Sequence, residues 1–569
     1  MSSAQRSPEP RWSTYPNRRA VLAITHNTTA ATRLFDTVGL LAGDPRVRIV
    51  FARTGSSVFD TDTGAYLAEH GVREISWREA LRQRFDLAVS ASYGGQLHKV
   101  RAPLVVVPHG MGYNKFLTKE QRTKNKEQRT KNKEQRTKNK EQRTNSVFGL
   151  SPDWLLHEGR VVPALIVLSH DEQRERLRRD CPEAVPNAAV TGDICFDRLR
   201  ASLPLRPTYR RALGLRAAQR LIVITSTWGA DSLLGVDPDL PRLLAAALPA
   251  DEFRIALAPH PNIAAFHSEY QFGSYLADAK RAGVLVPENV DAWRACLIAA
   301  DLTIGDHGSV AFYSCALGIP LLLSTAPTHT VDPASPIAQL LNAAPRLDTA
   351  GDPATQIRRT ITDHDPNRYA EITARTTSVP DRSAELLRAA LYRTMGLDEP
   401  TAPAEIDTLP LPPIAFTGAD AHVVQVRITD RTATLTRYPA ERLRSPDAPP
   451  VPNTHLAVET RETYRRWLDF ADVLLGPPGA DTPTWIAETL ARLPGCAVAA
   501  APAPDGDWLV GDRDTQLGVE GPYSAGRLFA SIAYCASTQG QPLSDLPGEW
   551  VIHCADETFE VSVTLCKPN

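Results

Sequence analysis

Short apolar runs alternate with segments of helical spacing through the first 205 residues. Runs of this kind, bounded by polar residues, are typical of strands buried on both faces of a sheet. Residues 27–43 follow the first run with the spacing of one apolar helix face, and this helix is expected to end near Gly43. The alternation predicts a mostly parallel sheet covered by helices. The runs that predict strands are residues 20–25, 47–53, 86–92, 103–109 and 164–170.

The same alternation begins again near residue 220. Residues 220–227 and 253–261 predict strands, and residues 237–250 and 265–283 predict the helices that follow them. Later apolar runs continue the pattern, so the chain is predicted to hold two consecutive α/β units. The first spans about residues 1–205 and the second about residues 206–397.

The rest of the chain differs in pattern. Residues 398–413 are rich in proline and acidic residues, which is typical of a linker. Residues 422–439 predict a β-hairpin with an Asp-Arg turn, and the final segment predicts two more strands. We therefore expect residues 414–569 to form a separate small α+β domain, in which no motif indicates a function.

A charged repeat interrupts the first unit. Residues 119–145 read KEQRTKN three times and then KEQRTN, and they carry a net charge of +7 while the whole chain carries −2. A seven-residue period suggests a coiled coil, but the repeat has no apolar residue to form a seam. Two interpretations stay open: a tolerated surface insertion, or a basic patch that contacts an anionic membrane or nucleic acid.

Composition narrows the class of protein. The 569 residues are too many for one core and 43% hydrophobic, which excludes a mainly disordered chain. Without the repeat the chain carries −9, so no specific nucleic acid is expected as a partner. The sequence has no long apolar stretch, no secretory signal at its start and no C-x-x-C pair among its eight cysteines. We expect a cytoplasmic protein with reduced thiols, with peripheral contact at the inner membrane face if the repeat binds lipid.

The strongest local motif lies in residues 300–323. A predicted strand ends at Gly305 and Asp306, the turn His307-Gly308-Ser309 follows, and a helix then runs to about Leu317. A helix N-terminus offers free N–H donors and a positive dipole end, which suit a phosphate group. The alternative is an ordinary capped turn between a strand and a helix.

The segment D-H-G-S-x-x-F-Y-x-x-A-L-G-x-P, residues 306–320, resembles the donor-site motif of GT-B proteins, above all of the CDP-glycerol glycerophosphotransferase (teichoic acid polymerase-like) family. Residues 257–262 (LAPHPN), 105–115 (VVVPHGMGYNK) and 225–229 (TSTWG) are similar to further segments of that family, in the same order. The resemblance covers about residues 20–390. This sequence departs from the family pattern at His307, where the family has a tyrosine, and at Gly308, where it has a serine. The family's Thr-Pro-Leu segment is also missing after Gly110.

The resemblance implies two Rossmann-like domains in a GT-B arrangement, with the acceptor on the N-terminal side and the nucleotide donor on the C-terminal side. His109 is the candidate base, and Asp306 is expected to orient His307 or bind an acceptor hydroxyl, with helix capping as the alternative. No metal and no cofactor are expected. The remaining candidates are Thr227, His260, His307, Gly308 and Ser309 for the donor phosphates, and His26, Gly110 and Lys115 for the acceptor side.

Three functions follow from these candidates. The first is a transferase that moves glycerophosphate or a sugar from a nucleotide-activated donor to a hydroxyl acceptor in surface-polymer or glycoconjugate synthesis. The second is a non-catalytic binding or scaffold protein with the same fold, favoured by the departures at His307 and Gly308. The third is a nucleotide-sugar 2-epimerase, which would need cleft carboxylates that the sequence does not clearly supply.

Overall fold

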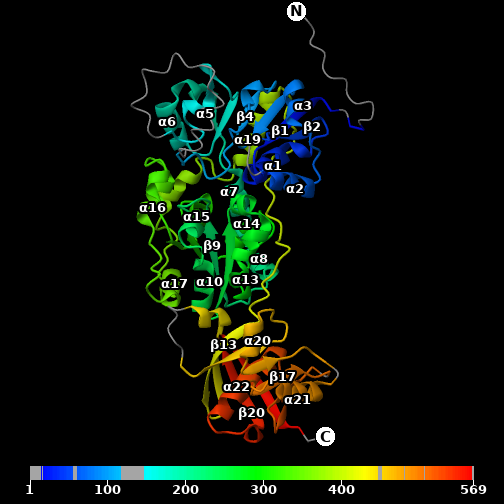
Figure 1. The fold of residues 1–569 in the computed structure, drawn as a ribbon. Helices are drawn as coiled ribbons and strands as arrows, with labels where there is room; N and C mark the ends of the chain where they lie inside the picture. The colour runs from blue at the N-terminus through cyan, green and yellow to red at the C-terminus, as the bar shows by residue number, and fades with distance from the viewer. Residues whose placement is uncertain are drawn as a thin grey trace, which may run out of the picture.

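The computed structural model describes residues 14–15, 17–55, 60–116, 146–445, 452–479, 481–504 and 506–566. The predicted repeat insert, residues 119–145, lies outside these ranges. Two α/β bodies and a β-rich body follow one another along the long axis of the molecule (Figure 1). Within the described ranges, no helix combines the length and apolar character that a membrane span requires.

The first body is a six-stranded sheet in which all paired strands are parallel, in the order β2-β1-β3-β4-β7-β8. Apolar clusters cover both of its faces, which explains why each strand reads as a continuous apolar run. Its strands are β1 (Arg19–Thr25), β2 (Val47–Arg53), β3 (Leu87–Ser90), β4 (Leu104–Val106), β7 (Leu165–Leu168) and β8 (Ala188–Val190). Its helices include α1 (Thr28–Ala42), α2 (Asp60–Glu69), α3 (Trp77–Arg82), α5 (Pro152–Leu155), α6 (Asp171–Asp180) and α7 (Ile194–Ser202). The five predicted strands are confirmed, and β8 was not predicted.

The second body repeats this topology with four parallel strands in the order β10-β9-β11-β12. The strands are β9 (Arg220–Ser226), β10 (Phe253–Pro259), β11 (Leu302–Gly305) and β12 (Leu321–Leu323). The surrounding helices include α8 (Arg206–Ala212), α9 (Leu233–Val236), α10 (Leu240–Ala247), α11 (Pro261–His267), α12 (Glu269–Tyr275), α13 (Ala277–Arg281), α14 (Ala292–Ala299), α15 (Ser309–Ala316), α16 (Pro336–Ala343) and α17 (Pro353–Thr362). Two Rossmann-like bodies are therefore present, as predicted.

One helix crosses between the two bodies. Helix α19 (Ser383–Met395) lies in the predicted second unit by sequence, but its residues Leu387, Leu391 and Met395 pack in the first core beside Val21. The Arg19 side chain fixes this position by donating from Nε to the carbonyl of Met395 over 2.9 Å. The first body is thus built from both ends of the α/β region.

The third body is a closed barrel of nine strands, which the predicted α+β class did not anticipate. Helix α22 (Tyr523–Thr538) packs into the barrel core, and α21 (Thr482–Arg492) packs outside strands β17 and β18. The predicted hairpin is confirmed as the antiparallel pair β13 and β14, and the predicted closing strands as β20 and β21. The strands are β13 (Ala421–Thr429), β14 (Thr432–Pro439), β15 (Thr454–Glu459), β16 (Val473–Leu475), β17 (Val498–Pro502), β18 (Trp508–Gly511), β19 (Gln516–Glu520), β20 (Gly548–Cys554) and β21 (Glu557–Leu565).

Ion pairs fix the barrel to the second body. Arg437 on β14 donates two hydrogen bonds, of 2.8 and 2.6 Å, to the buried carboxylate of Asp251, which precedes β10. The Ala250 N–H donates to the Arg437 carbonyl over 2.8 Å. The barrel therefore sits at the amino-terminal ends of the strands of the second sheet, away from their carboxyl ends.

The eight cysteines are all unpaired thiols, as the sequence predicts, and only Cys566 is not buried. The chain holds no disulfide to restrain the joints between its three bodies.

Candidate functional site

The two α/β sheets each contain a topological switch point, where ligands of open α/β sheets collect at the carboxyl ends of the strands. In the first sheet the switch lies between β1 and β3, and in the second between β9 and β11. His26 follows β1, Thr227 follows β9 and Asp306 follows β11. Contacts between the two bodies bring these strand ends together, so the predicted candidates lie around one interdomain joint.

Asp306 organises the switch point of the second sheet. Its Oδ2 accepts from the Thr227 N–H and hydroxyl over 2.8 Å each and from the Leu233 N–H over 3.0 Å. Its Oδ1 accepts from the Gly308 N–H over 3.0 Å, and the residue is 1% exposed. This buried carboxylate positions the turns after β9 and β11. Its predicted action on an acceptor hydroxyl or on His307 stays a prediction.

Helix α15 begins at this turn without a side-chain cap. Its N-cap residue is Gly308, and the first bond inside the helix runs from the Phe312 N–H to the Gly308 carbonyl over 3.4 Å. The N–H groups of residues 309–311 therefore have no partner within the helix. A Cβ at Gly308 would lie 2.9 Å from Cγ2 of Thr227, so the turn requires glycine. No side chain caps α15, but the Asp306 carboxylate accepts from the N–H of Leu233, the first residue of α9, so helix capping by Asp306 stays open as the alternative to its predicted role.

The loop after β4 packs directly against this helix start. The Met111 N–H donates to Oγ of Ser309 over 3.0 Å, and a Cβ at Gly110 would lie 2.5 Å from the same oxygen. Met111 is buried in the core of the second body. Ser309, predicted for the donor phosphates, thus contacts the predicted acceptor side, and Gly110 makes the close approach possible.

His260 lies at the same joint. Its Nδ1 accepts from the Asn262 N–H over 3.1 Å and caps α11, while Nε2 lies 3.4 Å from Oγ1 of Thr29 on α1. The ring of Trp228 is 6.3 Å away and 41% of that residue is exposed. Both the turn-forming and the site-lining interpretations of His260 are thus compatible with its contacts.

The charge of Lys115 acts on three of the predicted histidines, His109, His260 and His307. Its segment pairs with the second body, since Lys115 bridges Val331 and the Phe116 N–H donates to the Thr330 carbonyl over 2.9 Å. Burial lowers the pKa of the Lys115 amine, and the charge of Asp306 raises it in part. A second bridge joins Phe116 to Val147 across the ends of the predicted insert.

Three imidazoles are held neutral around this lysine. Burial, assisted by the charge of Lys115, lowers the pKa of His109 to about 4 and those of His260 and His307 to about 3. Nδ1 of His307 is buried and has no hydrogen-bond partner among the described residues. A buried polar atom without a partner is rare in proteins. A ligand with a hydrogen-bonding group at this position would satisfy Nδ1 of His307.

His26, predicted on the acceptor side, packs its ring against Gly94, where a Cβ would lie 2.2 Å from the imidazole. Its Nδ1 lies 3.2 Å from Oγ1 of Thr54. Its charge contributes to the lowered pKa of His109, so it belongs to the same group. Within the described ranges, no set of three or more His, Cys, Asp or Glu side chains is arranged to hold a metal.

A buried ionic network beside this cluster was not predicted from the sequence. Asp36 on α1 accepts two bonds, of 3.0 and 2.9 Å, from Arg294 on α14 and one of 2.5 Å from Arg198. Arg33, one helical turn before Asp36, donates to the Tyr313 hydroxyl of α15 over 3.3 Å. The sequence signal was available, because Arg33 and Asp36 interrupt the apolar face of the helix predicted over residues 27–43.

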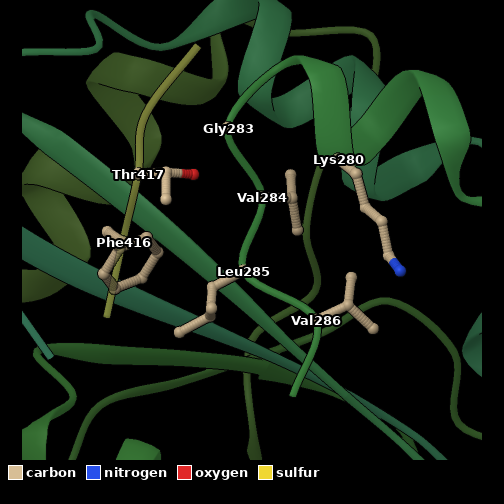
Figure 2. Close-up of a pocket in the computed structure, with 7 residues that line it drawn as sticks. All are labelled: Lys280, Gly283, Val284, Leu285, Val286, Phe416 and Thr417. Atoms are coloured by element: carbon tan, nitrogen blue, oxygen red, sulfur yellow. The ribbon is translucent and has the colours of Figure 1, made fainter. Parts of the chain in front are cut away.

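A separate pocket of about 190 Å³ lies along the backbone of residues 283–286, opposite Phe416 and Thr417 (Figure 2). Leu285 pairs there with β10, donating to the Ile255 carbonyl over 2.9 Å and accepting from the Leu257 N–H over 2.8 Å. None of the predicted site residues lines this pocket.

Comparisons with known proteins agree with the resemblance expected from sequence. No family model matches the chain, and no curated protein matches its sequence. The wall teichoic acid polymerase TagF matches with 12% identity and a TM-score of 0.42, over 67% of this chain and 89% of that one. UDP-GlcNAc 2-epimerase from Methanocaldococcus jannaschii matches with 10% identity and a TM-score of 0.38, over 66% and 99%. The S. aureus MnaA–UDP structure matches with 10% identity and a TM-score of 0.39, over 67% and 99%. The chain is thus distantly similar to a polymerase of the expected family and to nucleotide-sugar epimerases.

Proposed function

We propose that this protein is a transferase that moves glycerophosphate or a sugar from a nucleotide-activated donor to a hydroxyl acceptor, in surface-polymer or glycoconjugate synthesis. One observation carries the proposal: at the start of α15, which has no side-chain cap, Nδ1 of His307 is buried and has no hydrogen-bond partner among the described residues. A diphosphate supplies negative charge and acceptor oxygens at this position.

The donor diphosphate is assigned to the second body. We assign the phosphates to the N–H groups of residues 309–311, the Ser309 hydroxyl, His307 and His260, with Lys115 as the positive charge that acts on both histidines. Such groups stabilise negative charge that grows on the leaving nucleotide. Gly308 and Thr227 hold the turn, and Asp306 fixes both through its hydrogen bonds.

His109 is assigned as the general base. Its imidazole is neutral at pH 7, because burial and Lys115 hold its pKa near 4. A bound anion next to the ring would raise this pKa toward neutrality, which improves a base that works at pH 7. The acceptor oxygen would lose its proton to His109 and bond to phosphorus or to the anomeric carbon, while the nucleotide leaves with the electron pair of the broken bond. The acceptor is placed beside His26, Gly110 and Lys115.

A binding or scaffold protein is the second candidate. Two contacts favour it: Ser309 accepts from the Met111 N–H, and His260 lies against Thr29, so both donor-side groups already meet the first body. An epimerase is less well supported. Proton abstraction needs an accessible carboxylate. The carboxylate oxygens of Asp306 already accept hydrogen bonds from N–H and O–H groups, and those of Asp36 accept from a guanidinium group.

A ligand panel tests the proposal. CDP-glycerol, UDP-sugars and GDP-sugars are screened by thermal shift and then by isothermal titration, and at least one is expected to raise Tm. His109→Ala should keep donor binding and lose turnover. No stabilisation by any nucleotide would exclude both enzyme hypotheses, and full activity of the variant would remove His109 as the base.

The cellular location follows from the same proposal. Nucleotide-activated donors are made in the cytoplasm, so we place the protein there. Peripheral contact with an anionic membrane through residues 119–145 is the alternative role of the repeat, and sedimentation with anionic vesicles tests it.

A further inference from the structure

Among the described residues, no carboxylate lies at hydrogen-bond distance from the buried guanidinium of Arg33. It projects from α1, is 7% exposed, and its Nη1 has no hydrogen-bond partner among the described residues. Its Nη1 lies 4.0 Å from Oδ2 of Asp36. A buried guanidinium that is paired this weakly is costly, and proteins normally satisfy it with an anion.

Asp36 does not neutralise Arg33, because other arginines occupy it. Oδ1 accepts from Arg198 and Arg294, and Oδ2 accepts from Arg294. Three guanidinium groups thus surround one carboxylate. Two of them hold it in hydrogen bonds of 2.5 to 3.0 Å, whereas Arg33 makes none to it. A second buried carboxylate, Asp193, feels the charge of Arg33, and it accepts its hydrogen bond from the Tyr313 hydroxyl over 2.5 Å.

The remaining contact of Arg33 leads toward the proposed donor site. Nη2 donates to the Tyr313 hydroxyl over 3.3 Å, and the guanidinium lies 5.5 Å from the centre of that ring. Tyr313 belongs to α15, whose first residue is Ser309. Arg33 is also near enough to His109 for its charge to lower the pKa of that imidazole.

We propose that Arg33 is the residue through which the first body binds the anionic part of the donor. The guanidinium exchanges its long hydrogen bond to Tyr313 for phosphate oxygens, so that α1 and α15 hold the ligand from opposite sides of the joint. Because Arg33 can bind two oxygens at once, it fixes the orientation of the phosphate as well as its charge. This inference rests on the proposed function.

The test is isothermal titration of the full chain with inorganic pyrophosphate and CDP at low and moderate salt. Arg33→Met is expected to weaken pyrophosphate binding by about tenfold or more, the effect of losing hydrogen bonds to a charged group. Arg33→Lys keeps the charge and should recover part of the affinity. Arg198→Met is the matched control: it removes a cation from the same carboxylate and should leave the affinity within about twofold of wild type.

The outcomes separate this inference from the proposed function. If the wild type binds neither pyrophosphate nor CDP, both are overturned. If the wild type binds and Arg33→Met binds equally well, the role of Arg33 is overturned while the donor site stands. An equal loss in Arg198→Met would also overturn it, since the effect would then come from the cluster as a whole.

Stability is measured alongside affinity, because Arg33 also contacts Tyr313. If Arg33→Met does not fold, Tyr313→Phe decides: it removes the hydrogen bond and keeps the guanidinium. Its pyrophosphate affinity is expected to equal or exceed that of wild type. A tenfold loss would show that the Tyr313 hydroxyl, which accepts from Arg33 and donates to Asp193, and not a contact of Arg33 with the ligand, matters for binding.

Discussion

Replacing Asp306 with asparagine separates a positioning role of this carboxylate from a chemical one. The side chain accepts four hydrogen bonds, three on Oδ2 and one on Oδ1, and it is 1% exposed. Asparagine keeps one oxygen and replaces the other with an NH₂ group. With its oxygen at the Oδ2 position, it directs an N–H donor at the Gly308 N–H.

The expected cost follows from these contacts. A hydrogen bond to a buried charged group contributes about 1.5–3 kcal/mol and one between neutral groups about 1 kcal/mol. Losing the Gly308 bond and weakening the other three gives a destabilisation of about 3–5 kcal/mol for Asp306→Asn. Thr227→Val removes only the hydroxyl bond and is expected to cost about 1–2 kcal/mol. Glu288→Gln, at an exposed position, should stay within about 0.5 kcal/mol of wild type.

Urea unfolding followed by circular dichroism measures these differences. A chain of several domains need not unfold in one step. Hydrogen exchange of the backbone amides in peptides that cover β9 and β11 therefore identifies which unfolding transition belongs to the second body. An Asp306→Asn protein that unfolds within about 1 kcal/mol of wild type would refute the positioning role. Lost turnover in such a stable variant would then favour the predicted action of Asp306 on the acceptor.

Further predictions concern the joint and the repeat. Asp36→Ala leaves buried arginines unpaired and should lower the unfolding free energy by about 3–5 kcal/mol, measured by urea titration. The pKa of Asp36 in the folded protein is below its ordinary 3.8. The contribution of its ionised carboxylate to the unfolding free energy is therefore complete at neutral pH and is lost as the pH falls below about 4. A flat Tm from pH 6 to pH 3 would contradict this. Gly110→Ala should lower Tm and separate the loop from Ser309, because its Cβ would lie 2.5 Å from Oγ; unchanged exchange of the Met111 amide would contradict this. Pyrophosphate should bind more tightly at pH 5.5 than at pH 7.5. A bound anion raises the lowered pKa values of His109, His260 and His307, so that binding is accompanied by proton uptake. A pH-independent Kd in calorimetry would be evidence against this. Removing one heptad from residues 119–145 should change the unfolding free energy by only about 0.2 kcal/mol. This is the difference in closure entropy between the original and the shortened segment, whose ends are joined by the bridge from Phe116 to Val147. Insoluble protein would contradict a surface insertion.

Apolar runs predicted the parts of the fold that depend on local pattern. Except for β8, the strands of both sheets and the hairpin of residues 422–439 were found where the sequence places them, since a buried strand must be apolar throughout. The crossing of α19 into the first core was not predictable, because its apolar face would fit either core. Closure of the barrel depends on pairs between distant strands, such as β14 with β20, which no local pattern records.

The candidate site was predictable only in part. Strand ends brought His109, His260 and Asp306 into one joint, because carboxyl ends of parallel strands share an edge. The hydrogen bonds that fill the Asp306 carboxylate come from Thr227 and Leu233, 79 and 73 residues away, and single-sequence reasoning cannot pair them. Arg33 was overlooked because an arginine in a helix is usually a solvated surface residue.

The attachment of the barrel has a mechanical consequence. Because Arg437 and Asp251 clamp it to the end of the second sheet opposite the joint, the barrel extends that body along the long axis of the molecule (Figure 1). Any rotation of a few degrees where Asp36 meets Arg294 would therefore move the far end of the barrel through a much larger arc. A pair of fluorophores on the barrel and on the first body would report motions of the joint that are too small to detect at the site itself.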